Sequence, residues 1–220
     1  MTVLDDLKNI GVKDGDLMLV HSACSKVKAD AYEVFSVLRE SIGKDGTLVL
    51  PTFSFSHKWG APEMGILSRI CQSLSESERI PHPVHSFSIL GKLAKELGEI
   101  KNKSSYGADS LFGKLMELDG KILIIGLDYQ NSFTFTHYVE QIHGVSYREI
   151  QDLGGGYTIY GRKAGVVTWL DGMSAILDAS GKVSIGKIGQ AESRLVKARD
   201  AFDIINKNLT DEPGFAYKLV

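Results

Sequence analysis

The sequence predicts an α/β fold: a central mixed sheet flanked by helices on both faces, with an added antiparallel hairpin in the second half. Over about the first 130 residues, short apolar runs typical of buried strands alternate with amphipathic runs typical of helices, which favours a sheet between helix layers. Strand-like runs bounded by glycine after residue 155 predict the hairpin. No internal repeat, low-complexity tract or linker divides the 220 residues, so we expect residues 1–220 to form a single domain.

Apolar spacing and terminating glycines predict the N-terminal elements. Apolar residues recur at helical spacing over residues 3–10, and Gly11 is a typical stop. Residues 17–20 are uniformly apolar and predict a buried strand. Residues 31–42 are amphipathic and predict a helix that ends before the next glycine. A second short apolar strand is expected within residues 46–55.

The rest of the chain continues this alternation. Gly60, Pro62 and Gly65 mark residues 57–67 as a loop. The remaining expected elements are a short helix over 66–75, helices over 87–98 and 110–118, a buried strand over 120–128, a short helix over 134–144, a hairpin around 161–165, and a long final helix over 189–209.

Composition and charge exclude several classes of protein. The chain has 43% hydrophobic and 24% charged residues and a net charge of −2, which is typical of a globular protein and gives no electrostatic case for nucleic acid or an anionic membrane. It has no apolar run of about 18 residues, so no transmembrane helix is predicted, and its acidic start does not resemble a signal peptide. Cys24 and Cys71 suggest neither a disulfide framework nor a zinc site, so a reducing cytoplasm is the expected compartment.

Polar loops that follow strands are the expected ligand-binding positions in such folds. These loops are 21–25, 51–60 and 128–137. The first contains His21, Ser22 and Ser25 at a strand end that leads towards a helix. Backbone N–H groups at a helix start attract a phosphate or a developing oxyanion. The alternative is an ordinary helix cap beside a strand-end histidine.

The third loop leads into a helix that carries a candidate general base. Thr134, His137 and Glu140 are spaced three apart, so they share one face if the helix continues through all of them. A carboxylate beside an imidazole fixes the tautomer and supports the imidazolium during proton abstraction. The alternative is a solvent-facing His–Glu pair.

The segment "RIPHPVHS", residues 79–86, places two histidines close together. Its prolines favour extended conformations at the residues before them, which presents His82 and His85 on a shaped loop. Ser86 is expected to cap the helix over 87–98, and an exposed helix start beside Arg79 suits a phosphate. The alternative is a structural turn whose histidines hydrogen-bond the backbone.

Other patterns are weaker. The six histidines include no zincin spacing and no cysteine joins them, so no metal site is predicted. The glycines at 154–156 lack the rest of a dinucleotide fingerprint. Cys24 is either a nucleophile or, more simply, a small buried thiol. Trp59 offers a ring surface for a sugar or an adenine, or else is a half-buried anchor.

Six stretches occur in a specific order along the chain. They are "LKNIGVKDGDLMLVHSACS", "GKDGTLVLPTFSF", "RIPHPVHSFSILGKLA", "SSYGADSLFGKLMELDGKILIIGLD", "TFTHYVE" and "IGKIGQAESRLV". In this order they resemble the aminoglycoside 3-N-acetyltransferase family, a group that depends on coenzyme A. The resemblance covers nearly the whole chain, and the order of the motifs is more specific than any one of them.

The resemblance implies transfer of an acetyl group from acetyl-coenzyme A to an amine by direct attack, with no covalent enzyme intermediate. The family's Thr-x-x-His-x-x-Glu pattern matches Thr134, His137 and Glu140, which would make His137 the general base, Glu140 its orienting partner and Thr134 a donor near the thioester. Backbone N–H groups around Ser22 would stabilise the thioester oxygen. The implied coenzyme A contacts are His21, Ser22 and the nearby Ser25; Pro51, Thr52 and Phe53; and Arg79, His82, His85 and Ser86.

The identity of the acceptor amine stays open at this point. The chain is shorter than antibiotic-modifying members, and a polycationic aminoglycoside needs several carboxylates. The nearest acidic residues are Asp128, Glu140, Glu149 and Asp152. We therefore expect an amino sugar, such as a sugar nucleotide or polysaccharide precursor, ahead of an aminoglycoside. The expected substrate contacts are Asp128, Tyr129 and Trp59, and either Glu140 or Asp128 is expected to partner His137.

Two further hypotheses come from other classes of protein. A hydrolase would use Ser22 or Cys24 as nucleophile and would not need coenzyme A. A catalytically silent homologue would bind coenzyme A without turnover, although the retained Thr134, His137 and Glu140 favour an enzyme. The expected partner is a small-molecule amine, and a homodimer is a possible assembly.

Overall fold

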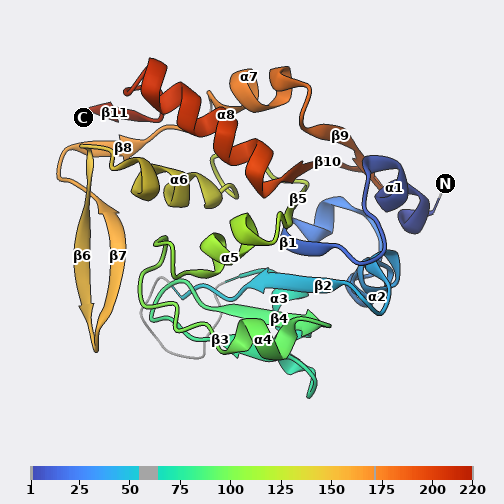
Figure 1. The fold of residues 1–220 in the computed structure, drawn as a ribbon. Helices are drawn as coiled ribbons and strands as arrows, with labels where there is room; N and C mark the ends of the chain where they lie inside the picture. Colours follow the sequence, from blue (N-terminus) through green and yellow to red (C-terminus); the bar gives the residue numbers. More distant parts are fainter. Residues whose placement is uncertain (1, 55–63, 171, 220) are drawn as a thin grey trace.

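A mixed sheet forms the centre of the protein in the computed structural model, which describes residues 2–54, 64–170 and 172–219 (Figure 1). The seven strands lie in the order β3-β4-β2-β1-β5-β10-β9. Their bounds are β1 (Leu17–Ser22), β2 (Thr47–Pro51), β3 (Glu78–Ile80), β4 (Phe87–Gly91), β5 (Lys121–Ile125), β9 (Ser184–Ile188) and β10 (Ala191–Lys197). Strand β1 pairs in parallel with β2 and β5, and the other pairs are antiparallel. The predicted mixed α/β class is therefore confirmed.

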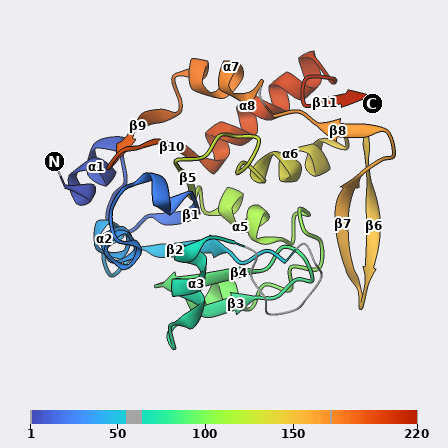
Figure 2. The same cartoon turned by 180° about the vertical axis from the view of Figure 1, so that it is seen from behind.

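Helices cover both faces of this sheet (Figures 1 and 2). They are α1 (Val3–Ile10), α2 (Ala31–Ile42), α3 (Ile66–Ser73), α4 (Ala94–Gly98), α5 (Leu111–Glu117), α6 (Phe135–His143), α7 (Met173–Leu177) and α8 (Ala198–Asp211), with short 3₁₀ turns η1 (Cys24–Lys26) and η2 (Asp178–Ser180). Alternate side chains of a strand point to opposite faces. Accordingly Met18 and Val20 join the apolar cluster under α1, α2 and α3, whereas Leu19 joins the cluster under α4 to α8.

Two small antiparallel pairs lie outside the main sheet. Strand β6 (Arg148–Gly154) pairs with β7 (Tyr157–Arg162), and β8 (Val166–Thr168) pairs with β11 (Tyr217–Leu219). The β6–β7 hairpin stands apart from the main sheet in both views (Figures 1 and 2). A hairpin was predicted in this half of the chain, but with its turn around 161–165. The turn lies instead at 154–156, where all three glycines have positive φ.

The expected helix over 87–98 is wrong in its first half, where β4 forms. Phe87 and Ile89 point to one face of the sheet and Leu90 to the other, which is the alternation of a strand. Gly91 ends the strand with φ +124°, and a Cβ atom there would lie 2.3 Å from the Gly46 carbonyl oxygen. Position 91 therefore requires glycine, and α4 begins shortly after it.

The expected helix over 189–209 is also wrong in its first part. Residues 191–197 form β10, which pairs antiparallel with β5, and only then does α8 begin. Leu195 and Val196 contact opposite apolar clusters, as consecutive strand residues do. The other expected helices and strands are present within a few residues of their predicted bounds, and most of the expected loop 57–67 lies outside the described residues. Within the described part of the chain, no helix has the length and apolar character needed to span a bilayer.

Candidate active site

Helix α6 presents His137 and Glu140 together. It begins just after Thr134, and one helical turn places the His137 Nδ1 atom 2.7 Å from Glu140 Oε2. The Glu140 side chain is fully buried, whereas 16% of the His137 side chain is exposed. The carboxylate thus lies behind the imidazole, and the imidazole is the member of the pair that a ligand can reach.

Two residues that follow α6 complete the surroundings of Glu140. The guanidinium Nε of Arg148 lies 2.6 Å from Glu140 Oε2, and the Tyr147 hydroxyl donates a 2.9 Å hydrogen bond to Oε1. Arg148 also donates to the Tyr160 carbonyl and the Thr168 hydroxyl. Burial alone would raise the pKa of Glu140, but His137, Arg148 and Tyr147 together hold that pKa below its usual value. Glu140 is therefore ionised.

An ionised carboxylate fixes the tautomer of His137. Because a carboxylate only accepts, Nδ1 carries the proton that points to Glu140, and Nε2 is left as the basic nitrogen. Arg148 Nη2 lies 2.9 Å from the same Nδ1, but a guanidinium only donates, so the two groups do not hydrogen-bond each other and both face Glu140 Oε2. Burial, followed by the positive charge of Arg148, lowers the pKa of His137. A neutral imidazole with a free Nε2 and a carboxylate behind it is the arrangement of a general base.

His137 lines a cavity of about 430 Å³, named here the His137 pocket. Its walls come from the 84–106 region, α6, the β6–β7 hairpin and β8. The lining residues are Val84, His85, Tyr106, Gln130, His137, Arg148, Ile159, Tyr160, Gly161, Arg162, Val167, Thr168 and Leu170. Tyr106 lies between two histidines, with its ring centroid 5.2 Å from that of His137 and its hydroxyl 3.0 Å from His85 Nε2.

The other predicted histidine, His82, has a structural role. Its Nδ1 accepts hydrogen bonds from the backbone N–H groups of Val84 at 3.0 Å and His85 at 2.9 Å. Nε2 therefore carries the proton and lies 3.3 Å from the Thr158 carbonyl oxygen of β7. Burial lowers the pKa of His82 to about 4. The sequence left two interpretations of residues 79–86, a ligand-binding loop and a structural turn. His82 hydrogen-bonds the backbone as in a structural turn, whereas His85 lines the His137 pocket.

The expectation that Ser86 caps a helix is wrong, so the phosphate predicted at that helix start loses its structural basis. Ser86 directly precedes strand β4, so no helix begins there, and its side chain is fully buried. Its hydroxyl donates to the Thr52 carbonyl at 2.7 Å and lies 3.2 Å from Arg79 Nη2. Pro51 ends β2 and is buried, and the ring of Phe53 packs edge-on against His85 at 4.7 Å. These residues form an interior network beside the His137 pocket.

The loop after β1 is more open than the 79–86 segment. His21 is 5% exposed, its Nε2 has no partner among the described residues, and burial lowers its pKa to about 4. Ser22 is half-buried and Ser25 is exposed. Lys26 and Lys28 were not singled out from the sequence, although they follow the predicted strand end directly. Both line a cavity of about 480 Å³, which we name the Lys26 cavity.

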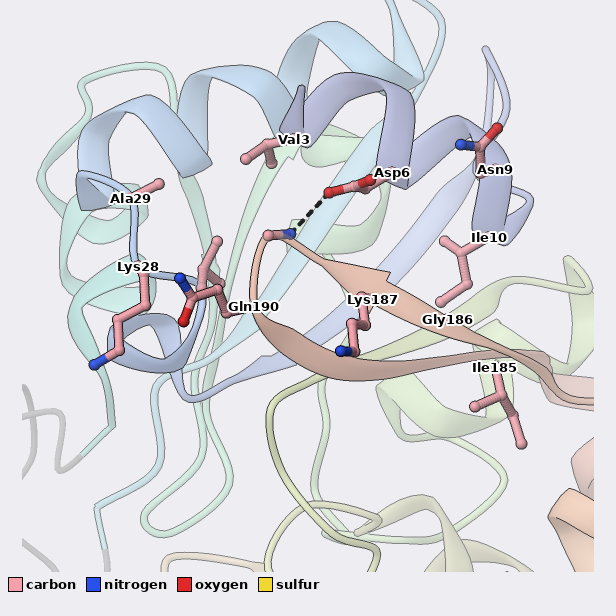
Figure 3. Close-up of a pocket in the computed structure, with 12 residues that line it drawn as sticks. Val3, Asp6, Asn9, Ile10, Lys28, Ala29, Ile185, Gly186, Lys187 and Gln190 are labelled. Carbon is pink, nitrogen blue, oxygen red and sulfur yellow. Dashed lines mark hydrogen bonds between the residues drawn. The ribbon is translucent and has the colours of Figure 1, made fainter. Parts of the chain in front are cut away.

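A larger cavity of about 620 Å³ adjoins this loop between α1 and the β9–β10 turn (Figure 3). Lys28 and Gln190 line both cavities, and the Asp6 carboxylate accepts a 2.8 Å hydrogen bond from the Gly189 N–H. Neither cavity is lined by His137. The size of a cavity therefore does not mark the candidate catalytic position, which is set by the His137–Glu140 pair.

The predicted substrate contacts do not gather around His137. Asp128 lines the Lys26 cavity and its carboxylate accepts the Asn131 N–H at 2.8 Å, so Glu140 is the partner of His137. The buried Tyr129 hydroxyl donates to Asp178, which is a contact within the protein interior. Thr134 precedes α6, and its buried hydroxyl has no partner among the described residues. Trp59 lies outside the described residues.

Sequence reasoning missed Arg148, Tyr147 and Tyr106. Arg148 would have been found if residues 148–154 had been read as a strand that returns past the end of α6. The tyrosine and arginine of "SYRE" come shortly after the end of the helix that carries Glu140, which was the available signal. Tyr106 lies in the "SSYG" stretch, and nothing local to that stretch indicates its contact with His137.

Known proteins share this fold and resemble this chain in sequence. The family model for aminoglycoside 3-N-acetyltransferase matches residues 19–210. An SPbeta prophage-derived aminoglycoside N(3')-acetyltransferase-like protein, YokD of Bacillus subtilis (strain 168), is 25% identical over 94% of this chain and 90% of its own length. Aminoglycoside N(3)-acetyltransferase III of Serratia marcescens is 28% identical, over 64% of this chain and 63% of that enzyme. The chain thus aligns with less than two thirds of the latter enzyme.

Solved structures agree on the fold. The crystal structure of YokD from Bacillus subtilis has a TM-score of 0.78 and 23% identity, covering 96% of this chain and 98% of that one. A mutant of aminoglycoside acetyltransferase AAC(3)-IVa in complex with apramycin gives 0.82 and 23%, covering 96% and 92%. The binary complex of AAC-IIIb with CoASH gives 0.78 and 22%, covering 95% of each chain.

The resemblance inferred from the motif order is therefore confirmed, together with the enzyme class and the coenzyme A co-substrate expected of the family. The match extends from β1 to the end of α8 and includes the helix that carries His137 and Glu140. The chain belongs to the aminoglycoside 3-N-acetyltransferase family, a family of acyltransferases that use coenzyme A.

Proposed function

We propose that this protein transfers an acetyl group from acetyl-coenzyme A to an amino group of a small molecule by direct attack of the amine. One observation supports the proposal above the others: His137 forms a 2.7 Å hydrogen bond with the buried Glu140 and lines a pocket. An amine must lose a proton as it attacks, and a neutral imidazole at the pocket wall can accept that proton.

The roles of the site residues follow from their contacts. His137 Nε2 accepts the proton of the attacking amine, and Glu140 stabilises the imidazolium that results. Arg148 and Tyr147 hold Glu140 ionised and in place. Acetyl-coenzyme A supplies the acetyl group as a thioester whose thiolate leaves. Because the pKa of His137 lies below its usual value, the base is neutral at pH 7.

The loop after β1 offers cations that suit the phosphates of coenzyme A. Lys26 and Lys28 are exposed, line the Lys26 cavity together, and form no ion pair within the described part of the chain. They follow β1, at the carboxyl ends of the parallel strands, where α/β folds bind ligands. His21, Ser22 and Ser25 belong to the same loop and stay the proposed neighbours of the cofactor. The buried segment around Ser86 offers it no exposed cation.

The comparisons favour one of the two acceptors expected from the sequence. The relatives' names support an aminoglycoside, whereas nothing in them points specifically to an amino sugar of a polysaccharide precursor. We keep the acceptor as a small-molecule amine and test both kinds. A homodimer also stays a prediction.

The test is release of thiol from acetyl-coenzyme A with a panel of aminoglycosides and amino sugars, using the wild type and His137→Ala. We expect release with the wild type that the variant loses, while coenzyme A raises the melting temperature of both. Turnover without any amine, with an acyl group on Ser22 or Cys24 detected by mass spectrometry, would establish the hydrolase alternative. Stabilisation by coenzyme A without turnover of any amine would indicate the silent homologue.

A further inference from the structure

The β6–β7 hairpin places two arginines directly opposite each other. Arg148 of β6 and Arg162 of β7 are register partners, so both side chains lie on the same face of the hairpin. Like charges in directly opposed positions repel across a two-stranded sheet. Both residues line the His137 pocket. A negative charge nearby would offset this repulsion.

Only one of these two charges is balanced. Glu140 lies 2.6 Å from Arg148 and neutralises it. Arg162 is exposed and forms no ion pair with any described residue. Its charge also contributes to the lowered pKa of His137, so Arg162 lies within electrostatic range of the imidazole. The pocket therefore has an unpaired cation near the proposed base.

The acidic residues of the hairpin do not balance Arg162. Glu149 is adjacent to Arg148 in β6, so its side chain points to the opposite face. Asp152 lies near the turn, where its carboxylate accepts the Gly154 N–H at 2.8 Å. Among the described residues that line the His137 pocket, none is an aspartate or a glutamate.

We infer that the acceptor amine carries an anionic group, a phosphate or a carboxylate, which Arg162 binds while the amine faces His137. This inference rests on the proposed transfer reaction. A guanidinium binds either anion through two parallel hydrogen bonds and is the side chain best suited to do so. A polycationic acceptor would meet the unpaired Arg162, with no described carboxylate among the residues that line the pocket to attract it. The inference therefore departs from the unmodified aminoglycosides that the relatives' names suggest.

The experiment compares amino-sugar acceptors with and without an anionic group, and a polycation. The value of kcat/KM is measured for glucosamine and glucosamine 6-phosphate, and for glucosamine 1-phosphate and UDP-glucosamine, with kanamycin as the polycation. The enzymes are the wild type, Arg162→Gln, Arg162→Glu and the control Lys163→Gln. Lys163 is the exposed neighbour of Arg162 and does not line the pocket. Lys163→Gln removes one positive charge, as Arg162→Gln does, without changing a residue that lines the pocket.

We expect the wild type to favour at least one anionic acceptor over glucosamine, and Arg162→Gln to reduce that preference by roughly 10- to 100-fold, which corresponds to one charge-assisted hydrogen bond. Lys163→Gln should keep the preference, and Arg162→Glu should shift it towards kanamycin. Equal or faster turnover of glucosamine or kanamycin, unchanged in Arg162→Gln, would overturn the inference and leave the transfer reaction intact. Absence of thiol release with every amine would count against the proposed function, on which the inference depends.

Discussion

Two histidines near the same pocket show how the partner of Nδ1 decides what an imidazole can do. In His137, Nδ1 donates to a buried carboxylate, so Nε2 is unprotonated and can accept a proton. In His82, Nδ1 accepts two backbone N–H groups, so Nε2 carries a proton and is itself a donor. Burial lowers the pKa of both rings, yet only the first can act as a base. Burial and a shifted pKa therefore do not identify the catalytic histidine, whereas the hydrogen-bond partner does.

The largest expected effect is on turnover when His137 is removed. His137→Ala should reduce kcat by about 10²- to 10⁴-fold, the range typical of a general base, because no other described group in the pocket combines a free basic nitrogen with a carboxylate behind it. The measurement is thiol release at saturating amine. His82→Ala is the matched control. Its folded fraction should retain most of the wild-type kcat. Equal losses in the two variants would contradict the contrast between the two rings.

The next largest expected effect is a loss of unfolding free energy when Glu140 is replaced by the neutral glutamine. Glu140→Gln leaves the guanidinium of Arg148, whose side chain is 5% exposed, without an anion. Breaking a buried pair in this way typically costs about 3–5 kcal/mol. We expect urea unfolding to show a loss of that size and thiol release to fall sharply.

A double variant separates stability from catalysis at this pair. Glu140→Gln combined with Arg148→Met removes the unpaired charge, so most of the stability should return, whereas activity should not. If the double variant regained activity as well as stability, the only role of Glu140 would be to neutralise the charge of Arg148. Unchanged unfolding of Glu140→Gln alone would contradict the ion pair.

A smaller loss of stability is expected at His82. His82→Ala leaves the backbone N–H groups of Val84 and His85 without an acceptor in a buried turn, at a cost of about 2–4 kcal/mol. His82→Asn keeps a side-chain oxygen close to the position of Nδ1 and should recover part of that loss. Urea unfolding of the three proteins measures this. If Asn destabilises as much as Ala does, the hydrogen bonds to Nδ1 are not what holds the turn.

The pH dependence of stability tests whether His82 is neutral in the folded protein, and its expected effect is smaller. The pKa of His82 is about 4 in the folded protein and 6.5 when unfolded, so between these values the unfolded chain binds the extra proton. Stability is thus fully present above pH 6.5 and is lost as the pH falls towards 4. Against the wild type, His82→Asn should show a shallower decline in that window, by at most ~1.4 kcal/mol per pH unit. Parallel curves would show that His82 does not stay neutral in the fold.

The sequence alone was sufficient where function depends on neighbours along one helix. His137 and Glu140 are three residues apart on α6, so their contact follows from helical geometry without knowledge of the fold. The paired histidines of the 79–86 segment were also noticed, but their roles depend on Thr158 of β7 and Tyr106, which lie far away in the sequence. No local pattern reports such contacts.

The errors in the fold have a shared cause. At β4–α4 and at β10–α8, a short strand leads into a helix with few or no residues between them. Apolar residues of such a strand combine with those of the helix into a pattern that fits helical spacing throughout. Gly91, with a positive φ, was the available sign of a break between β4 and α4. Between β10 and α8 no glycine intervenes, since β10 ends at Lys197 and α8 begins at Ala198. Arg148 and Arg162 were overlooked because only strand pairing places them opposite each other.

The smallest expected effect concerns the second oxygen of Glu140. The Tyr147 hydroxyl donates to Oε1 at 2.9 Å, so Tyr147→Phe removes one hydrogen bond to a buried carboxylate and leaves the ring in place. The cost should be about 1–2 kcal/mol in unfolding free energy, and kcat should fall by less than it does in Glu140→Gln. Because this bond helps to keep the pKa of Glu140 low, the variant tests whether Arg148 and His137 suffice to hold the carboxylate ionised. A kcat equal to that of the wild type would show that they do, and would confine the catalytic unit to His137, Glu140 and Arg148.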